Sequence, residues 1–282
     1  MTPTTLAPAL VLTEPRHARL AAHALADGAV VAQGFANFYV ITTRPDDATV
    51  RSVNVLKGRP PHQVGSITTT PSRLHMLFDW TRLPAGLGRG AVLDLMDALF
   101  QLGPFGFRGP AAAHVPDHLT EDDAGVRTAQ VIAPGYSCPS NAFLGASLAA
   151  IHDDLLYITS ANRSRHLTGA DDEPAHYRAD GIRAEFGHHP GFIVLEHADE
   201  SAARRQYPRH DPMSTTILAF HKLGRDQGDG RAQLVLERHG SLPAADVRAV
   251  VRAMGFDLVA GPKAMRRLLQ RDYGIAGDEV SR

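Results

Sequence analysis

The stretch from Leu155 to Ser164, LLYITSANRS, carries the strongest structural signal in this sequence. Its first half, Leu155 to Thr159, is an uncharged and mostly apolar run of the length typical of a buried strand. Its second half continues with small hydroxyl and amide side chains. In open α/β sheets, ligands bind at the carboxyl ends of strands. The stretch therefore predicts either a ligand-binding loop or an ordinary Asx or Ser turn, which uses the same residue types.

On either side of this stretch, segments typical of helices and strands alternate. Pro15 suits the first turn of a helix, and Gly28 suits its end. Residues 103–116 form a long loop, or a strand flanked by loops. The predicted strands span 29–33, 38–42, 65–70, 129–133, 155–159, 192–195, 215–220 and 233–237, and the predicted helices span 15–28, 46–56, 71–80, 91–102, 140–151, 174–186, 243–254 and 262–273. This alternation predicts a mixed α/β sheet.

Composition narrows the class of protein. Hydrophobic residues make up 44% and charged residues 21% of the 282 residues, as in an ordinary globular protein. The formal net charge of -1 gives no overall attraction to nucleic acid or to an anionic membrane. Cys138 is the only cysteine, which excludes an internal disulfide and a thiolate zinc site. No uncharged apolar run approaches the roughly 18 residues of a membrane span, so we expect no membrane partner and a cytoplasmic location.

The segment Lys57-Gly58-Arg59-Pro60 places two cations around one glycine at the end of a predicted helix. A lysine supplies a point charge and an arginine a bidentate fork, and the pair suits a phosphate chain. The alternative is a solvated basic turn that closes the helix favourably.

Two further polar segments border predicted strands: Ser214-Thr215-Thr216 precedes one, and Arg238-His239-Gly240 follows another. Each is common in isolation, because threonines favour strands. The histidines show no spacing typical of metal ligands, so we predict no metal site formed by the protein alone.

Taken together and in this order, these four segments resemble the YrdC-like family, which includes threonylcarbamoyl-adenylate synthases and carbamoyl-adenylate-forming enzymes. The matching motifs are K-x-R-P at Lys57 to Pro60, S-A-N-x-S at Ser160 to Ser164, S-T-[IV] near Ser214, and R-x-G at Arg238 to Gly240. The resemblance implies a twisted mixed sheet flanked by helices with a large concave cavity. We assign residues 1–240 to this nucleotide-binding domain, with a polar insertion near 163–213, and residues 241–282 to a helical C-terminal extension.

The resemblance also implies a nucleotidyltransferase that uses ATP and Mg²⁺. It implies that Lys57 and Arg59 grip the ATP phosphates. By the same resemblance, the nucleotide-binding residues are Ser160, Ala161, Asn162, Ser214 and Arg238. The implied small-molecule substrates are bicarbonate or another carbamoyl donor, and an amine or amino acid.

The first hairpin departs from the family pattern. Threonylcarbamoyl-adenylate synthases show P-T-[ED]-T-[VY]-[YF]-G there, whereas this chain has Gly34-Phe35-Ala36-Asn37-Phe38-Tyr39-Val40. We expect Phe35, Asn37, Tyr39 and Thr159 to line the substrate pocket. We also expect L-threonine to be a poor substrate, since an apolar pocket cannot compensate the desolvation of an ammonium or hydroxyl group.

A non-catalytic module that binds nucleotide, double-stranded RNA or tRNA is the alternative function. Four arginines of the polar insertion, Arg163, Arg165, Arg178 and Arg183, favour it. Structured RNA is therefore a second predicted partner.

Overall fold

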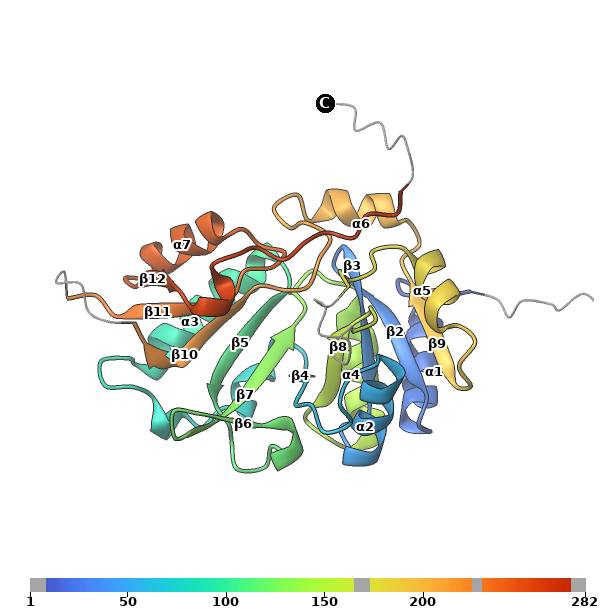
Figure 1. The fold of residues 1–282 in the computed structure, drawn as a ribbon, viewed down its shortest axis with the longest axis horizontal. Helices are drawn as coiled ribbons and strands as arrows, with labels where there is room; N and C mark the ends of the chain where they lie inside the picture. The colour runs from blue at the N-terminus through green and yellow to red at the C-terminus, as the bar shows by residue number, and fades with distance from the viewer. Residues whose placement is uncertain (1–8, 165–172, 225–229, 275–282) are drawn as a thin grey trace, which may run out of the picture.

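The computed structural model describes residues 9–164, 173–224 and 230–274. Figure 1 shows the arrangement of its helices and strands. Within the described ranges, the helices are α1 (Pro15–Ala26), α2 (Asp47–Leu56), α3 (Arg89–Leu102), α4 (Ser140–Ile151), α5 (Ala179–Phe186), α6 (Glu200–Gln206) and α7 (Ala244–Ala253). The strands are β1 (Leu10–Val11), β2 (Val30–Phe35), β3 (Phe38–Thr43), β4 (Ser66–Thr68), β5 (Phe105–Pro110), β6 (Glu121–Asp123), β7 (Val126–Ala133), β8 (Leu156–Ser160), β9 (Phe192–Glu196), β10 (Ile217–Leu223), β11 (Gln233–Arg238) and β12 (Asp257–Ala260).

The strands form one mixed sheet. Their order is β1-β9-β2-β3-β8-β4-β7-β5-β10-β11-β12, and β6 pairs with β7 beside this path. β2 and β3 form the predicted antiparallel hairpin, whereas β11 and β12 run parallel. β9 lies between β1 and β2, so the polar segment predicted as an insertion contributes a strand to the sheet. The predicted α/β class, a mixed sheet flanked by helices, is confirmed.

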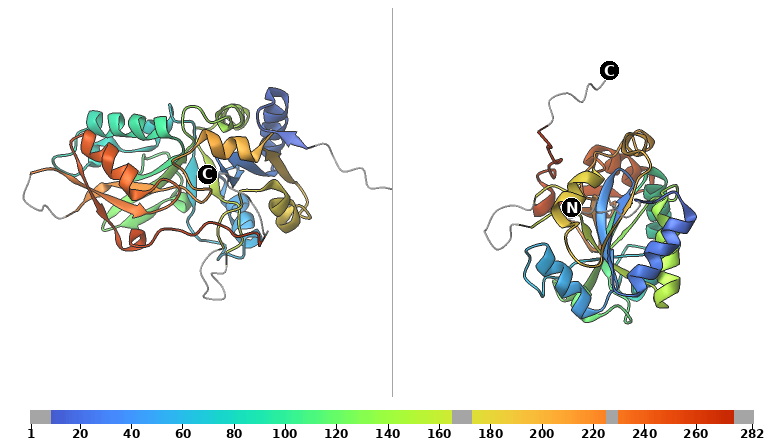
Figure 2. Two further views of the ribbon diagram at one scale, coloured as in Figure 1. Left: turned by 90° about the horizontal axis from the view of Figure 1, so that it is seen from above. Right: turned by 90° about the vertical axis from the view of Figure 1, so that its right-hand side faces the viewer.

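Helices cover both sides of the sheet (Figure 2). α1 packs closely on α4, and α3 contacts α7. The apolar spacing in α1 explains this packing, because Ala18, Ala21, Ala22 and Leu25 share one buried face. None of the described helices is long and apolar enough to cross a membrane.

Local sequence places three segments at the same part of the sheet. Asp46 caps α2 through its side chain, which accepts a hydrogen bond from the Thr49 amide at 3.0 Å. The helix ends at Leu56, and Gly58 adopts a positive φ of 75° that turns the chain toward Arg59. β8 ends at Ser160, and β11 ends at Arg238 beside the start of β10.

The helix predicted over residues 71–80 is wrong. Residues 71–80 contain only short 3₁₀ turns, Leu74–Leu77 and Trp80–Arg82. Between the turns, Phe78 pairs with Ala111 as an isolated β-bridge, which holds the backbone extended. Phe78 and Trp80 both contact Phe220, and the Trp80 ring stacks on the Phe220 ring with centroids 5.7 Å apart.

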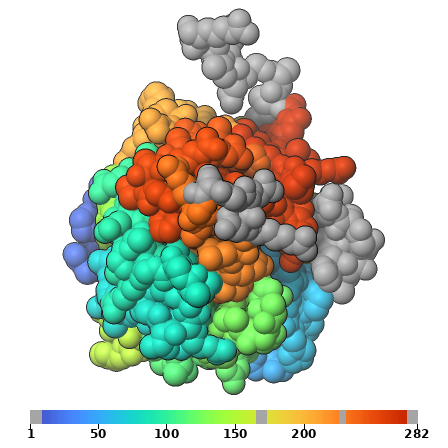
Figure 3. All heavy atoms as spheres, turned by 90° about the vertical axis from the view of Figure 1, so that its left-hand side faces the viewer, coloured from blue at the N-terminus to red at the C-terminus, as the bar shows by residue number. Residues whose placement is uncertain are grey.

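The C-terminal part corrects the prediction of an entirely helical extension. α7 matches the first predicted helix, but β12 adds a strand to the sheet, and only Pro262–Ala264 of the second predicted helix forms a 3₁₀ turn. Met265 and Leu269 are exposed, at 73% and 76%, so they cover no core. Figure 3 shows this part of the chain (red) lying against β10 and β11 (orange).

Candidate functional site

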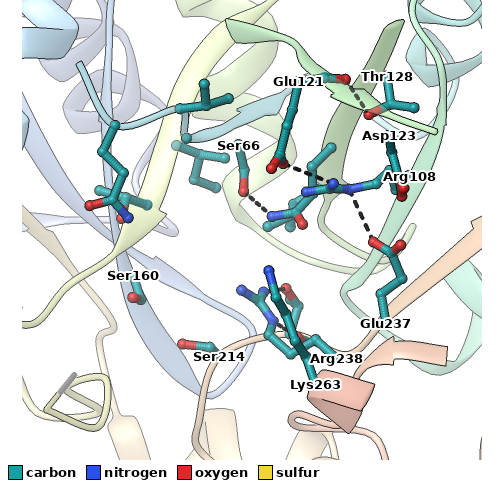
Figure 4. A pocket seen from close by; sticks show the side chains of 18 of the residues that line it. Ser66, Arg108, Glu121, Asp123, Thr128, Ser160, Ser214, Glu237, Arg238 and Lys263 are labelled. Atoms are coloured by element: carbon teal, nitrogen blue, oxygen red, sulfur yellow. Dashed lines mark hydrogen bonds and ion pairs between the residues drawn. The ribbon is translucent and has the colours of Figure 1, made fainter. Parts of the chain in front are cut away.

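A cavity of about 870 Å³ opens on the sheet, as the resemblance implied. Its walls come from the connection between α2 and β4, from strands β3 to β8, from β10 and β11, and from the segment after β12 (Figure 4). This volume suits a small-molecule or cofactor site. Five predicted site residues line it: Arg59, Thr159, Ser160, Ser214 and Arg238.

Arg238 is held at the end of β11 by Thr215. Its Nε donates to the Thr215 carbonyl oxygen at 2.7 Å, and its Nη2 donates to the Thr215 hydroxyl at 2.8 Å. Among the described residues, no carboxylate forms an ion pair with Arg238. Burial and, to a smaller extent, the positive charges of Arg59 and Arg108 together lower the pKa of the Arg238 guanidinium to about 10. Three positive charges therefore converge on this wall of the cavity.

Arg59 comes from the connection after α2, and Arg108 comes from β5. Arg59 Nη1 donates to the Thr159 hydroxyl at 2.9 Å. Arg108 projects from β5, with Glu121 at 2.9 Å and Glu237 at 3.0 Å. The sequence analysis missed Arg108, although a charged residue inside the strand sequence FGFRGP is a usable signal.

The segments around Ser214 and Gly240 interlock beneath the arginines. The Ser241 amide donates to the Ser214 carbonyl oxygen at 2.9 Å, and the Gly240 amide donates to the Thr216 hydroxyl at 3.1 Å. A Cβ at Gly240 would lie 2.2 Å from the Ser214 carbonyl oxygen, so only glycine fits there. The R-x-G motif therefore ends in a glycine because its backbone lies against Ser214 and Thr215.

Lys57, predicted to grip the ATP phosphates together with Arg59, lies behind the cavity wall. Lys57 is fully buried and does not line the cavity. Its Nζ donates to the carbonyl oxygen of Ser160, and its own carbonyl oxygen accepts from the Ser164 amide at 2.7 Å. Its observed contacts fix the loop that follows β8.

Ala161 and Asn162 also lie behind the cavity wall and do not line it. The Ala161 amide donates to the Tyr39 carbonyl oxygen at 3.0 Å, and Ser160 Oγ donates to Asn162 Oδ1. These two residues shape the loop that presents Ser160. Residues 165–172, including the predicted Arg165, lie outside the described residues.

Three of the four residues predicted for the substrate pocket do not line the cavity. Phe35 packs edge-on against Phe38 with ring centroids 5.8 Å apart. Asn37 donates from Nδ2 to the His210 carbonyl oxygen at 2.6 Å, and the Tyr39 hydroxyl donates to Glu200 at 3.0 Å. Side chains alternate along β3, and so Phe38 and Val40 line the cavity instead.

A charged network lies beside Arg108. Lys222 Nζ bridges Asp123 at 2.6 Å and Glu237 at 2.7 Å, and His221 Nε2 lies 2.8 Å from Asp123. The ligand atoms of Asp123, His221 and Glu237 all lie within 4.8 Å of one another. However, Lys222 already engages both carboxylates, and Arg108 pairs with Glu237 as well. The described residues therefore do not fit a cation held by the protein alone.

Solved structures with the same arrangement of strands and helices provide a comparison. No protein-family model matches this sequence, and no curated protein is detectably similar to it. P. abyssi Sua5 complexed with L-threonine is similar, with a TM-score of 0.60 and 18% identity over 92% of this chain and 65% of that chain. A hypothetical protein from Streptococcus mutans follows, with a TM-score of 0.55 and 14% identity over 84% of this chain and 91% of that chain. E. coli YciO has a TM-score of 0.50 and 15% identity over 73% of this chain and 84% of that chain.

The chain has the YrdC-like fold. The matched part corresponds to 65% of the Sua5 chain, which is less than two thirds of its length. The identities of 14% to 18% establish the fold, and function must be argued from the cavity itself. In this YrdC-like fold, the cavity combines an arginine cluster with the hydroxyl groups of Ser160, Ser214 and Thr215.

Proposed function

We propose that this chain is an ATP-dependent enzyme of the YrdC-like family that forms a carbamoyl- or threonylcarbamoyl-type adenylate. The observation that carries the proposal is the convergence of Arg59, Arg108 and Arg238 on one cavity wall. Guanidinium groups bind phosphate through charge-assisted, often bidentate hydrogen bonds. The Thr159 hydroxyl orients Arg59, and the carbonyl and hydroxyl oxygens of Thr215 orient Arg238 without cancelling the charge of Arg238.

The proposed chemistry is electrostatic. A carboxylate oxygen of a carbamate substrate attacks the α-phosphorus of ATP, the bond from that phosphorus to the bridging oxygen breaks, and pyrophosphate leaves. The arginines stabilise the negative charge that develops on the leaving group. The nucleophile is already an anion, so no general base is required. The cavity limits the access of water to the labile mixed anhydride.

Mg²⁺ is proposed as the accompanying cation. It usually keeps several waters and binds substrate phosphates together with one or two carboxylates. Asp122 at the rim is the side chain that would share it, while Arg108 engages Glu121 and Lys222 engages Asp123 and Glu237. When bound, Mg²⁺ would neutralise phosphate charge.

The substrate other than ATP is proposed to be bicarbonate or another carbamoyl donor, with an amine or amino acid. P. abyssi Sua5 is known in complex with L-threonine, so threonine is the natural first compound to test. We still expect L-threonine to be a poor substrate here. The reason is no longer Phe35, because Phe35 does not line the cavity. Phe38, Val40 and Ile158 line the cavity near Ser160, and such apolar side chains offer no partner to an ammonium or hydroxyl group.

Binding to RNA, the alternative, has weaker support. Arg178 lies 2.8 Å from Asp180, Arg183 lies 2.5 Å from Glu196, and Arg163 lies 3.7 Å from Glu185. Paired arginines attract a polyanion less than a basic patch without acidic neighbours does.

Pyrophosphate release from ATP tests the proposed function. The assay compares complete mixtures with mixtures that lack bicarbonate or the amine, and it includes L-threonine. Arg59→Gln should abolish release, whereas Arg51→Gln, an exposed arginine on α2 that pairs with Asp47, should not. ATP binding without release under any mixture would favour the non-catalytic module. Absence of ATP binding would exclude the proposed enzyme and a nucleotide-binding module, and would leave only RNA binding.

A further inference from the structure

We infer that Lys263, which follows β12, is a further polyphosphate-binding residue of the cavity. The inference rests on the proposed function for the identity of the nucleotide, and it gives a role to the C-terminal segment Gly261–Gly274. None of the four family-like motifs includes Lys263. Its position follows from the strand that the sequence analysis missed.

The sheet register brings Lys263 beside Arg238. β11 and β12 are parallel, with Leu236 opposite Ala260, so their carboxyl ends lie next to each other. The Gly261 amide donates to the Leu236 carbonyl oxygen at 2.8 Å and continues this pairing by one residue. Pro262 then begins a 3₁₀ turn that carries Lys263. In Figure 4 the Lys263 side chain extends into the cavity next to Arg238.

The two cations share no acidic partner. Among the described residues, Lys263 forms no ion pair or hydrogen bond, and it is exposed at the cavity rim. Like charges placed side by side repel one another unless an anion lies between them. The nearby carboxylate of Glu237 is already occupied by Arg108 and Lys222. A bound polyphosphate would compensate the charges of Arg238 and Lys263 together.

The C-terminal segment is anchored at two distant points, which fixes the position of Lys263. Arg267 Nη2 donates to the Ser241 carbonyl oxygen at 2.8 Å, and its Nη1 lies 2.6 Å from Asp211. Farther along, Arg271 Nε donates to the Pro174 carbonyl oxygen at 2.7 Å, and the Tyr273 hydroxyl lies 2.9 Å from His176 Nδ1. The segment therefore crosses from β12 to the region of α5, as Figure 1 shows.

Arg266 provides a matched control. It lies three residues from Lys263 on the same segment, is exposed and carries the same charge, but it does not line the cavity. A general attraction between the segment and any polyanion would depend on both residues. A specific contact in the cavity would depend on Lys263 alone.

Calorimetry with ATP, AMP and inorganic pyrophosphate tests the inference in the full chain. Lys263→Ala should weaken ATP and pyrophosphate binding about three- to tenfold at low salt, the range expected for one accessible charged contact. The affinity for AMP should fall less than that for ATP, because Coulomb attraction grows with the charge of the ligand. Lys263→Arg should retain most of the affinity, and Arg266→Ala should change it less than about twofold. The effect of Lys263→Ala should shrink at high salt.

The outcomes separate this inference from the proposed function. Equal effects of Lys263→Ala and Arg266→Ala, or no effect of either on ATP binding, would overturn the role of Lys263 and leave the proposed function standing. Lys263-dependent binding of pyrophosphate without any turnover would support this inference and count against the proposed enzyme. Failure of the wild-type chain to bind ATP, AMP or pyrophosphate would overturn both.

Discussion

Within the part of the chain that the structure describes, Thr215 alone fixes the guanidinium of Arg238, through its carbonyl oxygen at 2.7 Å and its hydroxyl at 2.8 Å. Both acceptors are neutral, so they orient the arginine and leave its positive charge uncompensated. Arg238 ends β11, and Thr215 precedes the antiparallel β10. The pairing of two strands therefore produces the geometry of the arginine cluster.

Arg238→Gln should weaken ATP binding by about 1.5–3 kcal/mol, the range for a hydrogen bond to a charged group. The same change relieves repulsion within the arginine cluster, so the variant should unfold at a higher temperature than wild type when no ligand is present. Calorimetry and thermal unfolding measure the two effects. Arg248→Gln, an exposed arginine on α7, serves as the control. An unchanged ATP affinity in Arg238→Gln would contradict the site assignment.

Lys57 and Arg59 should have separable roles. Lys57→Met removes the donor to the buried Ser160 carbonyl and should lower the free energy of unfolding by about 1–3 kcal/mol. Arg59 lines the cavity, so Arg59→Gln should lower ATP affinity and reduce the free energy of unfolding less than Lys57→Met does. Urea unfolding and ATP titration of both variants provide the comparison. A stable Lys57→Met variant with unaltered folding but no ATP affinity would assign Lys57 to the nucleotide instead.

The carboxylate of Asp123 should contribute stability that is lost in acid. The Lys222 ammonium, and then His221, lower the pKa of Asp123 to about 2 from the ordinary value of 3.8. A lowered carboxyl pKa stabilises the fold above pH 4, and this contribution disappears as the pH falls from about 4 to about 2. Its size is on the order of 1–2 kcal/mol. Asp123→Asn should therefore flatten this part of the stability profile measured by urea unfolding, whereas Asp122→Asn should not.

His210 should make the fold less stable below neutral pH. Burial lowers the pKa of His210 to about 4 from 6.5, so the folded protein keeps this imidazole neutral. The unfolded chain binds a proton near pH 6.5, and stability therefore falls between about pH 6.5 and pH 4. This difference is worth about 3 kcal/mol at pH 4.

The test compares the free energy of unfolding at pH 7 with that at pH 5. His210→Gln should lose about 2 kcal/mol less than wild type over this interval. The exposed His23→Gln should behave as wild type. Identical losses in His210→Gln and wild type would show that other groups cause the acid sensitivity.

Local sequence was sufficient to locate many elements and part of the site. The apolar run Leu155 to Thr159 matches β8, and Asp46 caps α2 as its residue type predicts. The arginines Arg59 and Arg238 were predicted because they match the K-x-R-P and R-x-G motifs of the family resemblance. The helix predictions failed at residues 71–80 and 262–273. There, contacts with distant residues such as Ala111 and Ser241 hold the backbone in another form.

The sequence by itself determined the α/β class, because the spacing of apolar residues and the positions of glycine and proline act within a few residues. Only the tertiary structure decided which side chains face the cavity. The alternation of side chains along β3 turned Phe38 inward instead of Tyr39, and burial placed Lys57 behind Ser160. Likewise, Arg108 and Lys263 join Arg238 only through strand pairings that connect residues far apart in the chain. The reason is physical: register and burial depend on long-range packing, which no short window of sequence encodes.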